Sequence, residues 1–367
     1  MIADSRALSA RTVVFVRYGG NTTSPEPLND AQPGDLLLPS NRTLRARGSG
    51  TYAKPALSES DLLHRWEQRG LDLGDRDRSA RYLRHIGYYR LSAYVRSFEQ
   101  QRDVLRPGTT FDDVLGLYIF DRKLRLLVLD AVERVEVATR AAIGDRMSLV
   151  SGPHWYEDAH LFANRRSHAV LLSKVDTIVE DQLARPADQP SHADSFTAAL
   201  EHYLTQYDQP SRPPSWIVLE ELSLGSVRTI YSSLADPSYK SAIARSLGLM
   251  TPLLDSWLLS YQRVRNISAH HSRLWNRGLG VYPAIPKSRA IEWLQDRKLF
   301  AREPWRGQRL YPVLVSLQSV LHTIAPGSAW SGRLADLLAE HSTVPLAPMG
   351  IPRDWYDDPF WPRRPND

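Results

Sequence analysis

The sequence predicts an all-α protein, and three observations support this prediction. Apolar side chains recur at three- and four-residue steps through residues 111–149, which places them on one face of a long helix. Helix-start and helix-stop signals recur too, such as Ser58 with Asp61 three residues later and Gly70 at the expected end. The apolar–polar alternation typical of strands is nearly absent. We therefore expect residues 51–367 to form one helical domain with an aromatic C-terminal tail.

Composition limits the chemistry that the chain can perform. Its 367 residues are enough to bury a large core, and a formal net charge of +5 permits a polyanionic partner without requiring one. There is no cysteine, which excludes disulfides, thiolate nucleophiles and cysteine-ligated metal sites. No apolar run approaches the roughly 20 residues needed to cross a bilayer. We expect a cytoplasmic protein without a membrane partner.

Residues 1–50 differ from the remainder of the chain. They mix Gly, Pro, Ser, Asn and Thr and show no sustained helical period. This composition predicts a flexible, disordered leader, which could also reflect an over-extended start of the coding region. A basic arm formed by residues 41–47 that contacts RNA is the less favoured alternative.

Helices of the N-terminal half follow from local signals. The aromatic cluster at residues 86–94 has helical spacing, and we favour packing for most of its side chains. Base stacking by Tyr88 or Tyr89 is the alternative. The other helices expected in this half cover residues 59–69, 76–86 and 111–149.

The second half of the long helix carries a charged face. Glu133, Glu136 and Arg140 lie three and four residues apart and so share that face. They could form an intrahelical ion pair on a solvated surface. Alternatively, the face could pack near the helix that contains Arg265 and orient its cationic groups. The sequence favours neither interpretation.

The C-terminal half is also expected to be helical. Gly225, inside a helix that begins after Ser215, indicates a kink or a close approach of two helices. The aromatic tail, residues 349–361, is expected to wrap back onto the bundle. The expected helices cover residues 168–184, 194–207, 216–228, 251–277, 287–300, 308–324 and 328–340.

The candidate functional residues lie at the end of the helix expected over residues 251–277. Two residues of this group, Arg265 and His270, are separated by about 140° around an ideal helix, so their side chains meet poorly unless the helix is irregular or two copies form a composite cleft. A polar stripe at helical spacing would join Asn266, His270, Arg273 and Arg277. The remaining candidates in this stretch are His271 and Asn276.

These residue types suit cleavage of RNA without a metal or other cofactor. Histidine can exchange protons with the 2′-hydroxyl and the 5′-oxygen, and arginine can bind the phosphate as charge develops on it. Asn266 could hold a water or polarise the phosphate. The pattern Arg-x4-His is weak by itself. His271 could be a hydrogen-bonded core histidine, and Arg273 and Arg277 could complement the helix dipole. On spacing alone, structural roles are favoured.

A longer stretch of sequence changes this balance. Residues 265–277 read Arg265-Asn-Ile-Ser-Ala-His-His-Ser-Arg-Leu-Trp-Asn-Arg277 and strongly resemble a motif of the Abi-type phage abortive infection proteins, the AbiD/AbiF-like family. Other blocks resemble motifs of the same family in the same order, so that the likeness covers nearly all of residues 54–361. These blocks are residues 54–58, 86–91, 130–136, 213–216, 220–225 and 349–355.

The resemblance implies a HEPN-type helical bundle, a fold found in metal-independent ribonucleases. It implies that Arg265 and His270 are the catalytic residues, with Asn266 in the polar position after the arginine. In HEPN ribonucleases the catalytic arginine and histidine usually act across a dimer interface. The resemblance further implies an RNA substrate, a role as a toxin in phage defence, and regulation by a protein or RNA antitoxin. The alternative function is a non-catalytic RNA-binding protein or an antitoxin-regulated helical scaffold of a defence complex.

Overall fold

The computed structural model describes residues 50–185 and 196–362, with side chains omitted for residues 196–198. Contacts divide the chain into Met1–Ala56 and Leu57–Asp367, and the helices and strands of the described residues all lie in the second unit. Residues 1–49 lie outside the described residues, so the disordered leader stays a prediction.

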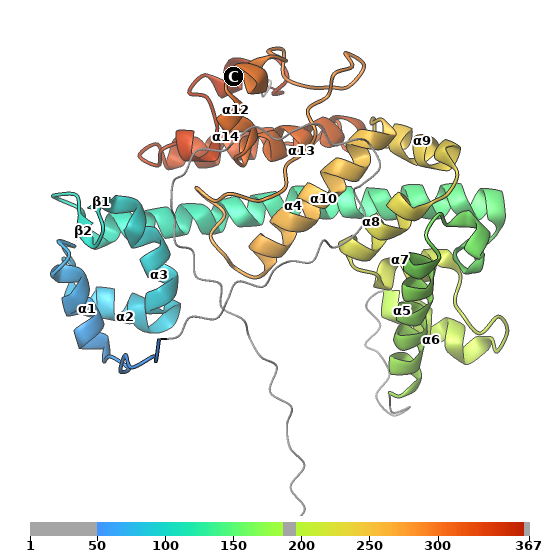
Figure 1. Ribbon diagram of the computed structural model, residues 1–367, viewed down its shortest axis with the longest axis horizontal. Helices are drawn as coiled ribbons and strands as arrows, with labels where there is room; N and C mark the ends of the chain where they lie inside the picture. The colour runs from blue at the N-terminus through green and yellow to red at the C-terminus, as the bar shows by residue number, and fades with distance from the viewer. Residues whose placement is uncertain (1–49, 186–195, 363–367) are drawn as a thin grey trace, which may run out of the picture. The chain divides into compact units, whose positions relative to one another are not determined.

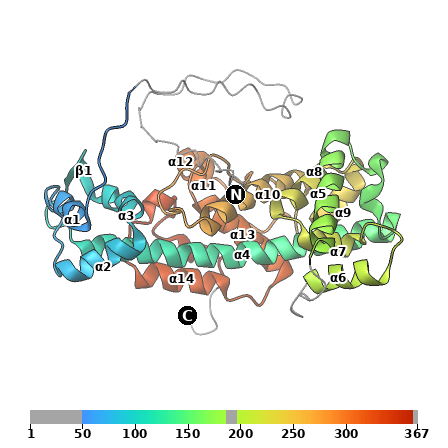
Figure 2. The ribbon, with the colours of Figure 1, turned by 90° about the horizontal axis from the view of Figure 1, so that it is seen from below.

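The long helix α4 (Phe111–Ser151) is the element against which most other helices pack. It begins at a capping box in which Thr110 and Asp113 exchange side-chain and backbone hydrogen bonds. At 1.5 Å per residue it is about 60 Å long. Figures 1 and 2 show the other helices distributed along its length. The helix predicted over residues 111–149 is therefore confirmed.

Three short helices and a small hairpin lie against the start of α4. The predicted capping box of Ser58 and Asp61 is present, and Gly87 ends α2 with a positive φ of 91°. Tyr88 stacks on Trp66 with ring centroids 5.0 Å apart, as the packing interpretation predicts, whereas Tyr89 is 84% exposed. These elements are α1 (Glu59–Glu67), α2 (Arg76–Ile86), α3 (Tyr88–Val95), β1 (Glu99–Gln101) and β2 (Val104–Leu105).

Five helices gather around the other end of α4 (Figure 1). The single helix predicted over residues 216–228 is wrong, because Leu222 adopts an extended conformation and the Ser223 side chain caps a new helix. The close approach predicted at Gly225 is confirmed, since a Cβ there would lie 2.5 Å from the Gln262 side chain. The helices are α5 (Arg165–Leu183), α6 (Phe196–Gln206), α7 (Ser215–Glu221), α8 (Leu224–Ser233) and α9 (Pro237–Ser246).

The helix α10 (Thr251–Ala269) crosses α4 near its middle and also packs against α8 (Figure 1). It buries Trp257, Leu258 and Tyr261, the last of which lies four and three residues after the other two, so that they share one face. The prediction that this helix continues to residue 277 is wrong, because it ends at Ala269.

Of the remaining helices, two are short, one is largely buried and the last is amphipathic. The helix predicted over residues 287–300 is wrong. The Arg297 guanidinium donates to the carbonyl oxygens of Ser288 and Ile291, and the Asp358 carboxylate accepts the Gln295 N–H, so tertiary hydrogen bonds replace helical ones. The helices of this part are α11 (Leu299–Arg302), α12 (Pro304–Gly307), α13 (Tyr311–Ile324) and α14 (Trp330–Glu340).

The aromatic tail returns to the bundle, as predicted. Trp355 and Trp361 are buried, and Trp361 stacks on Tyr311 of α13 with ring centroids 6.4 Å apart. The fourteen α-helices and one two-stranded sheet of the described residues confirm the all-α fold. Within the same residues, no helix is both long and apolar enough to cross a membrane.

Candidate functional site

The end of α10 is a tight turn with a histidine in an unusual backbone conformation. The N–H of His271 donates to the Ser268 carbonyl at 3.0 Å, and the N–H of Ser272 donates to the Ile267 carbonyl at 2.9 Å. This pair of bonds defines a Schellman motif, which places glycine, or less often asparagine, where the chain turns left-handed. Here His271 occupies that position with φ of 55°. The predicted polar stripe is therefore wrong, because Arg273 and Arg277 lie beyond the helix.

Arg265, Asn266 and His270 all present exposed side chains at this end of α10. The backbone still links them, because the His270 N–H donates to the Asn266 carbonyl at 3.1 Å. Within residues 50–185 and 196–362, none of the three side chains forms a hydrogen bond or an ion pair. An arginine, an asparagine and a histidine at one helix end therefore remain available to a ligand. His271 is exposed as well, so its interpretation as a core histidine is wrong.

Two arginines hold the turn after α10 against α3. Arg90 of α3 donates to the His271 carbonyl oxygen at 2.6 Å, and Arg273 donates to the carbonyl of Ala93 near the end of α3. Arg273 thus complements the C-terminus of α3 and not that of α10. Burial lowers the pKa of the Arg273 guanidinium, with Asp121 opposing the shift.

Two further arginines lie near Arg273 and add positive charge to the turn after α10. Arg277 and Arg96 lie close enough to Arg273 to act in the same direction as burial on its pKa. Arg277 also donates weakly to the Arg273 carbonyl, at 3.5 Å. Asn276 is exposed and has a positive φ of 49°. The turn therefore combines two left-handed residues with a cluster of cations, and a cluster of this kind suits phosphate groups.

A buried carboxylate beneath the turn is a residue that sequence reasoning missed. Asp121 of α4 is fully buried and accepts the N–H groups of Leu274 and Trp275 at 3.0 and 2.6 Å. The Tyr94 hydroxyl donates to it at 2.7 Å, and Arg125 pairs with it. Burial, together with the Asp121 charge, raises the pKa of Tyr94 well above its usual value. The sequence carries one signal of this role, since position 121 falls on the apolar stripe of α4 at helical spacing.

Among the described residues, no hydrogen bond or ion pair joins the charged face of α4 to the exposed side chains of α10. Glu136 and Arg140 form the intrahelical ion pair that one interpretation predicts, with nitrogen and oxygen 2.6 Å apart, but the pair is largely buried. Arg140 also donates to the Leu222 carbonyl at 2.8 Å and lies 3.6 Å from Glu220. Glu133 is exposed. The pair therefore joins α4 to the end of α7.

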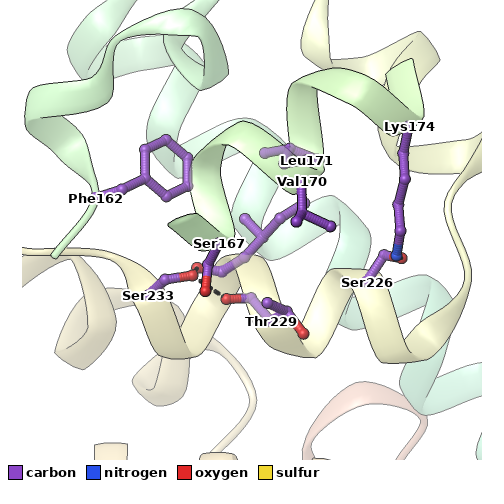
Figure 3. Close-up of a pocket in the computed structure, with 9 residues that line it drawn as sticks. Phe162, Ser167, Val170, Leu171, Lys174, Ser226, Thr229 and Ser233 are labelled. Carbon is purple, nitrogen blue, oxygen red and sulfur yellow. Dashed lines mark hydrogen bonds between the residues drawn. The ribbon is translucent and has the colours of Figure 1, made fainter. Parts of the chain in front are cut away.

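A pocket between α5 and α8 contains none of the predicted site residues. It spans about 280 Å³, part of which is open to solvent, and is lined by side chains that include Phe162, Lys174 and Thr229. Figure 3 shows Lys174 reaching Ser226, to which it donates at 2.8 Å. The Thr229 and Ser233 hydroxyls donate to helix carbonyls. Because Lys174, Ser226, Thr229 and Ser233 are already hydrogen-bonded, we assign no function to this pocket.

In the part of the chain that the structure describes, no group of three or more His, Asp or Glu residues could hold a metal ion. The expectation that the protein uses no cofactor stays a prediction.

Comparison with known proteins gives one match. The model of the Abi-like protein family matches residues 81–276, which is more than half of the chain and includes α3, α4 and the end of α10. No curated protein and no solved structure matches. The matched region contains Arg265, His270 and Asp121, so that both the exposed residues and the carboxylate beneath the turn lie inside it. The chain belongs to the Abi-like protein family.

Proposed function

We propose that this protein is a metal-independent endoribonuclease of the HEPN type that acts as a toxin in abortive-infection defence against phage. The observation that carries the proposal is the exposure of Arg265, Asn266 and His270 together at the end of α10. Their side chains make no hydrogen bond or ion pair with the described residues, so stability does not account for them. Membership of the Abi-like family supports the role in defence.

The proposed reaction is a transesterification at one phosphodiester. The ribose 2′-oxygen bonds to phosphorus and the bond to the 5′-oxygen breaks, which leaves a 2′,3′-cyclic phosphate and a 5′-hydroxyl. His270 transfers a proton, because imidazole titrates near neutral pH. The Arg265 guanidinium binds the phosphate oxygens as negative charge develops on them. Asn266 holds a water or a phosphate oxygen.

The reaction needs two proton transfers, one from the 2′-hydroxyl and one to the 5′-oxygen, whereas each chain supplies one His270. We therefore propose a homodimer in which two α10 ends form a composite cleft, with His271 as a supporting residue. The cationic side chains of Arg273 and Arg277 and the exposed ring of Tyr89 suit the phosphates and bases of RNA. A cognate RNA or a protein antitoxin would restrain the toxin by covering this surface.

The test is cleavage of labelled RNA by the full chain in the presence of EDTA. We expect His270→Ala and Arg265→Ala each to lower kcat by at least about a hundredfold, since each removes one proton-transfer or charge-stabilising group. The matched controls are His160→Ala and Arg166→Ala, which change the same residue types at exposed positions near α5. Circular dichroism should show the same helical content in all four variants.

Three outcomes decide between the functions. EDTA-resistant products that depend on His270 and carry cyclic phosphate ends support the enzyme. Full cleavage by the Arg265, His270 double variant would show that the activity resides elsewhere. A mobility shift of the RNA without products would favour the alternative, an RNA-binding protein. The arginines of the turn around Arg273 are the groups that would bind the RNA phosphates in that case.

A further inference from the structure

The turn after α10 adopts a backbone conformation that its residue types do not favour. His271 and Asn276 both have positive φ, and neither is glycine. Left-handed backbone is disfavoured for residues with a side chain, although His and Asn adopt it more often than most. Such a conformation persists only where the surrounding structure determines it. The groups that hold the turn are therefore part of the site.

Asp121 is the group best placed to hold it. Its carboxylate lies under the turn, on a different helix and 153 residues earlier in the sequence than Leu274. One oxygen accepts both the Leu274 and the Trp275 N–H, and the second oxygen accepts the Tyr94 hydroxyl. Only a carboxylate offers this many acceptor positions without presenting a donor to the same N–H groups.

The charge of Asp121 is itself compensated. Arg125, one turn further along α4, is nearly buried and pairs with the carboxylate, and it also donates to the Tyr94 hydroxyl at 3.3 Å. A buried charge is stable only with such partners. The network therefore ties three segments together: the end of α3, the first half of α4 and the turn that follows α10.

We propose that Asp121 is a positioning residue for the nucleolytic site: by binding the Leu274 and Trp275 N–H groups, it fixes the turn and so the placement of His270 relative to Arg265. This role rests on the proposed function. Asp121 does not touch the substrate, because its side chain is fully buried. It acts through the backbone of the turn, as the groups behind a catalytic side chain commonly do.

The principal variant is Asp121→Asn, which keeps the size of the side chain but replaces one acceptor oxygen with a donor. We expect faster hydrogen–deuterium exchange in peptides that cover residues 270–277, with unchanged exchange in α13. We expect kcat for RNA cleavage to fall by about tenfold to a hundredfold with KM little changed, since displacement of a catalytic group by about 1 Å has such an effect. In a double-mutant cycle, Asp121→Asn added to His270→Ala should cause no further loss.

Two other variants complete the experiment. Asp176→Asn is the matched control, because it makes the same chemical change in a carboxylate of α5 that pairs with Arg212, away from the turn. It should leave exchange at residues 270–277 and cleavage unchanged. Tyr94→Phe removes the hydroxyl that donates to Asp121 and keeps the charges of Asp121 and Arg125. It should lower kcat by roughly fivefold, the equivalent of one hydrogen bond, and it provides the test if Asp121→Asn does not fold.

The readouts separate this inference from the proposed function. Unchanged exchange at residues 270–277 in both the Asp121 and Tyr94 variants overturns the inference, whatever the activity. Faster exchange with full cleavage also overturns it, because the turn would then not position the reaction. If the wild-type protein cleaves no RNA, the proposed function fails and the catalytic part of this inference fails with it, while hydrogen exchange still decides whether Asp121 holds the turn.

Discussion

His271 illustrates how a single residue can oppose the local preference of the chain. It stands at the left-handed position of a Schellman motif with φ of 55°. A side chain there costs about 1–2 kcal/mol relative to glycine. Arg90 binds its carbonyl oxygen, and Asp121 binds the N–H groups three and four residues later. These contacts offset the strain and leave the imidazole exposed beside His270.

Replacement of His271 by glycine should therefore stabilise the protein. We expect His271→Gly to raise the free energy of unfolding by about 0.5–1 kcal/mol, measured by urea denaturation. Glycine relieves the backbone strain at φ of 55°, and this gain exceeds the cost of the greater backbone freedom that glycine has in the unfolded chain. The matched control is Ala141→Gly, at an exposed, right-handed position inside α4, which should lower it by about 0.5–1 kcal/mol. A loss of stability in both variants would mean that His271 is unstrained.

The roles of some single residues can be predicted from the sequence, and those of others cannot. Arg265 and His270 could be selected because the blocks around them resemble a family. The position of Asp121 on an apolar stripe shows that it needs a buried partner. That the partners are two backbone N–H groups 153 and 154 residues away could not be predicted, because every residue type except proline carries the same N–H.

The helix α14 shows how one side chain can join two elements. Trp330 is fully buried at the start of α14, and its indole N–H donates to the Leu127 carbonyl of α4 at 2.8 Å. Nearby, Arg333 donates to Asp130, also of α4, at 2.7 Å. The second contact is exposed and contributes little, so the buried Trp330 side chain contributes more to the attachment than this ion pair does.

Truncation of this indole should destabilise the whole domain. We expect Trp330→Ala to lower the free energy of unfolding by about 3–5 kcal/mol, the range for a buried tryptophan. Trp216→Ala is the matched control: that side chain is 54% exposed, and its loss should change stability by less than about 1 kcal/mol. Thermal denaturation followed by circular dichroism measures both. Equal effects would indicate that α14 is not held through Trp330.

Helix boundaries were predictable where the signals are local. The helix α2 begins after the cap Asp75 and ends at Gly87, as its sequence indicates. The helix predicted over residues 251–277 extends too far because Asn266, His270, Arg273 and Arg277 recur at helical spacing. The buried side chains of Leu274 and Trp275 also fall on the apolar period of α10. Those side chains reach the core from a turn, and periodicity alone does not distinguish a turn from another helical turn.

Two partly buried histidines couple the stability of the molecule to pH. Burial lowers the pKa of His322 in α13, with Glu292 opposing the shift. Burial also lowers the pKa of His341 after α14, with Lys123 acting in the same direction. Both groups therefore bind a proton more readily in the unfolded chain, where histidine titrates near pH 6.5. The stability that they contribute is present above that pH and is lost as the pH falls.

We expect the free energy of unfolding to decrease between pH 7.5 and pH 5.5. Carboxylates with a lowered pKa, such as Glu340, titrate below their usual value near 4.5 and do not contribute in this window. His322→Gln should reduce the dependence on pH, and the exposed control His160→Gln should not. Urea denaturation at several pH values measures this. An unchanged dependence in His322→Gln would show that its burial does not act on stability.

The position of the aromatic tail has a consequence for how the protein is made. Trp355 and Trp361 close the core over Tyr311, yet they are synthesised after Arg265 and His270. A nascent chain therefore carries Arg265 and His270 before its core can close. Interrupted translation would yield chains with Arg265 and His270 on an unfinished fold, and we expect a stop codon before Trp355 to abolish function by preventing the core from closing.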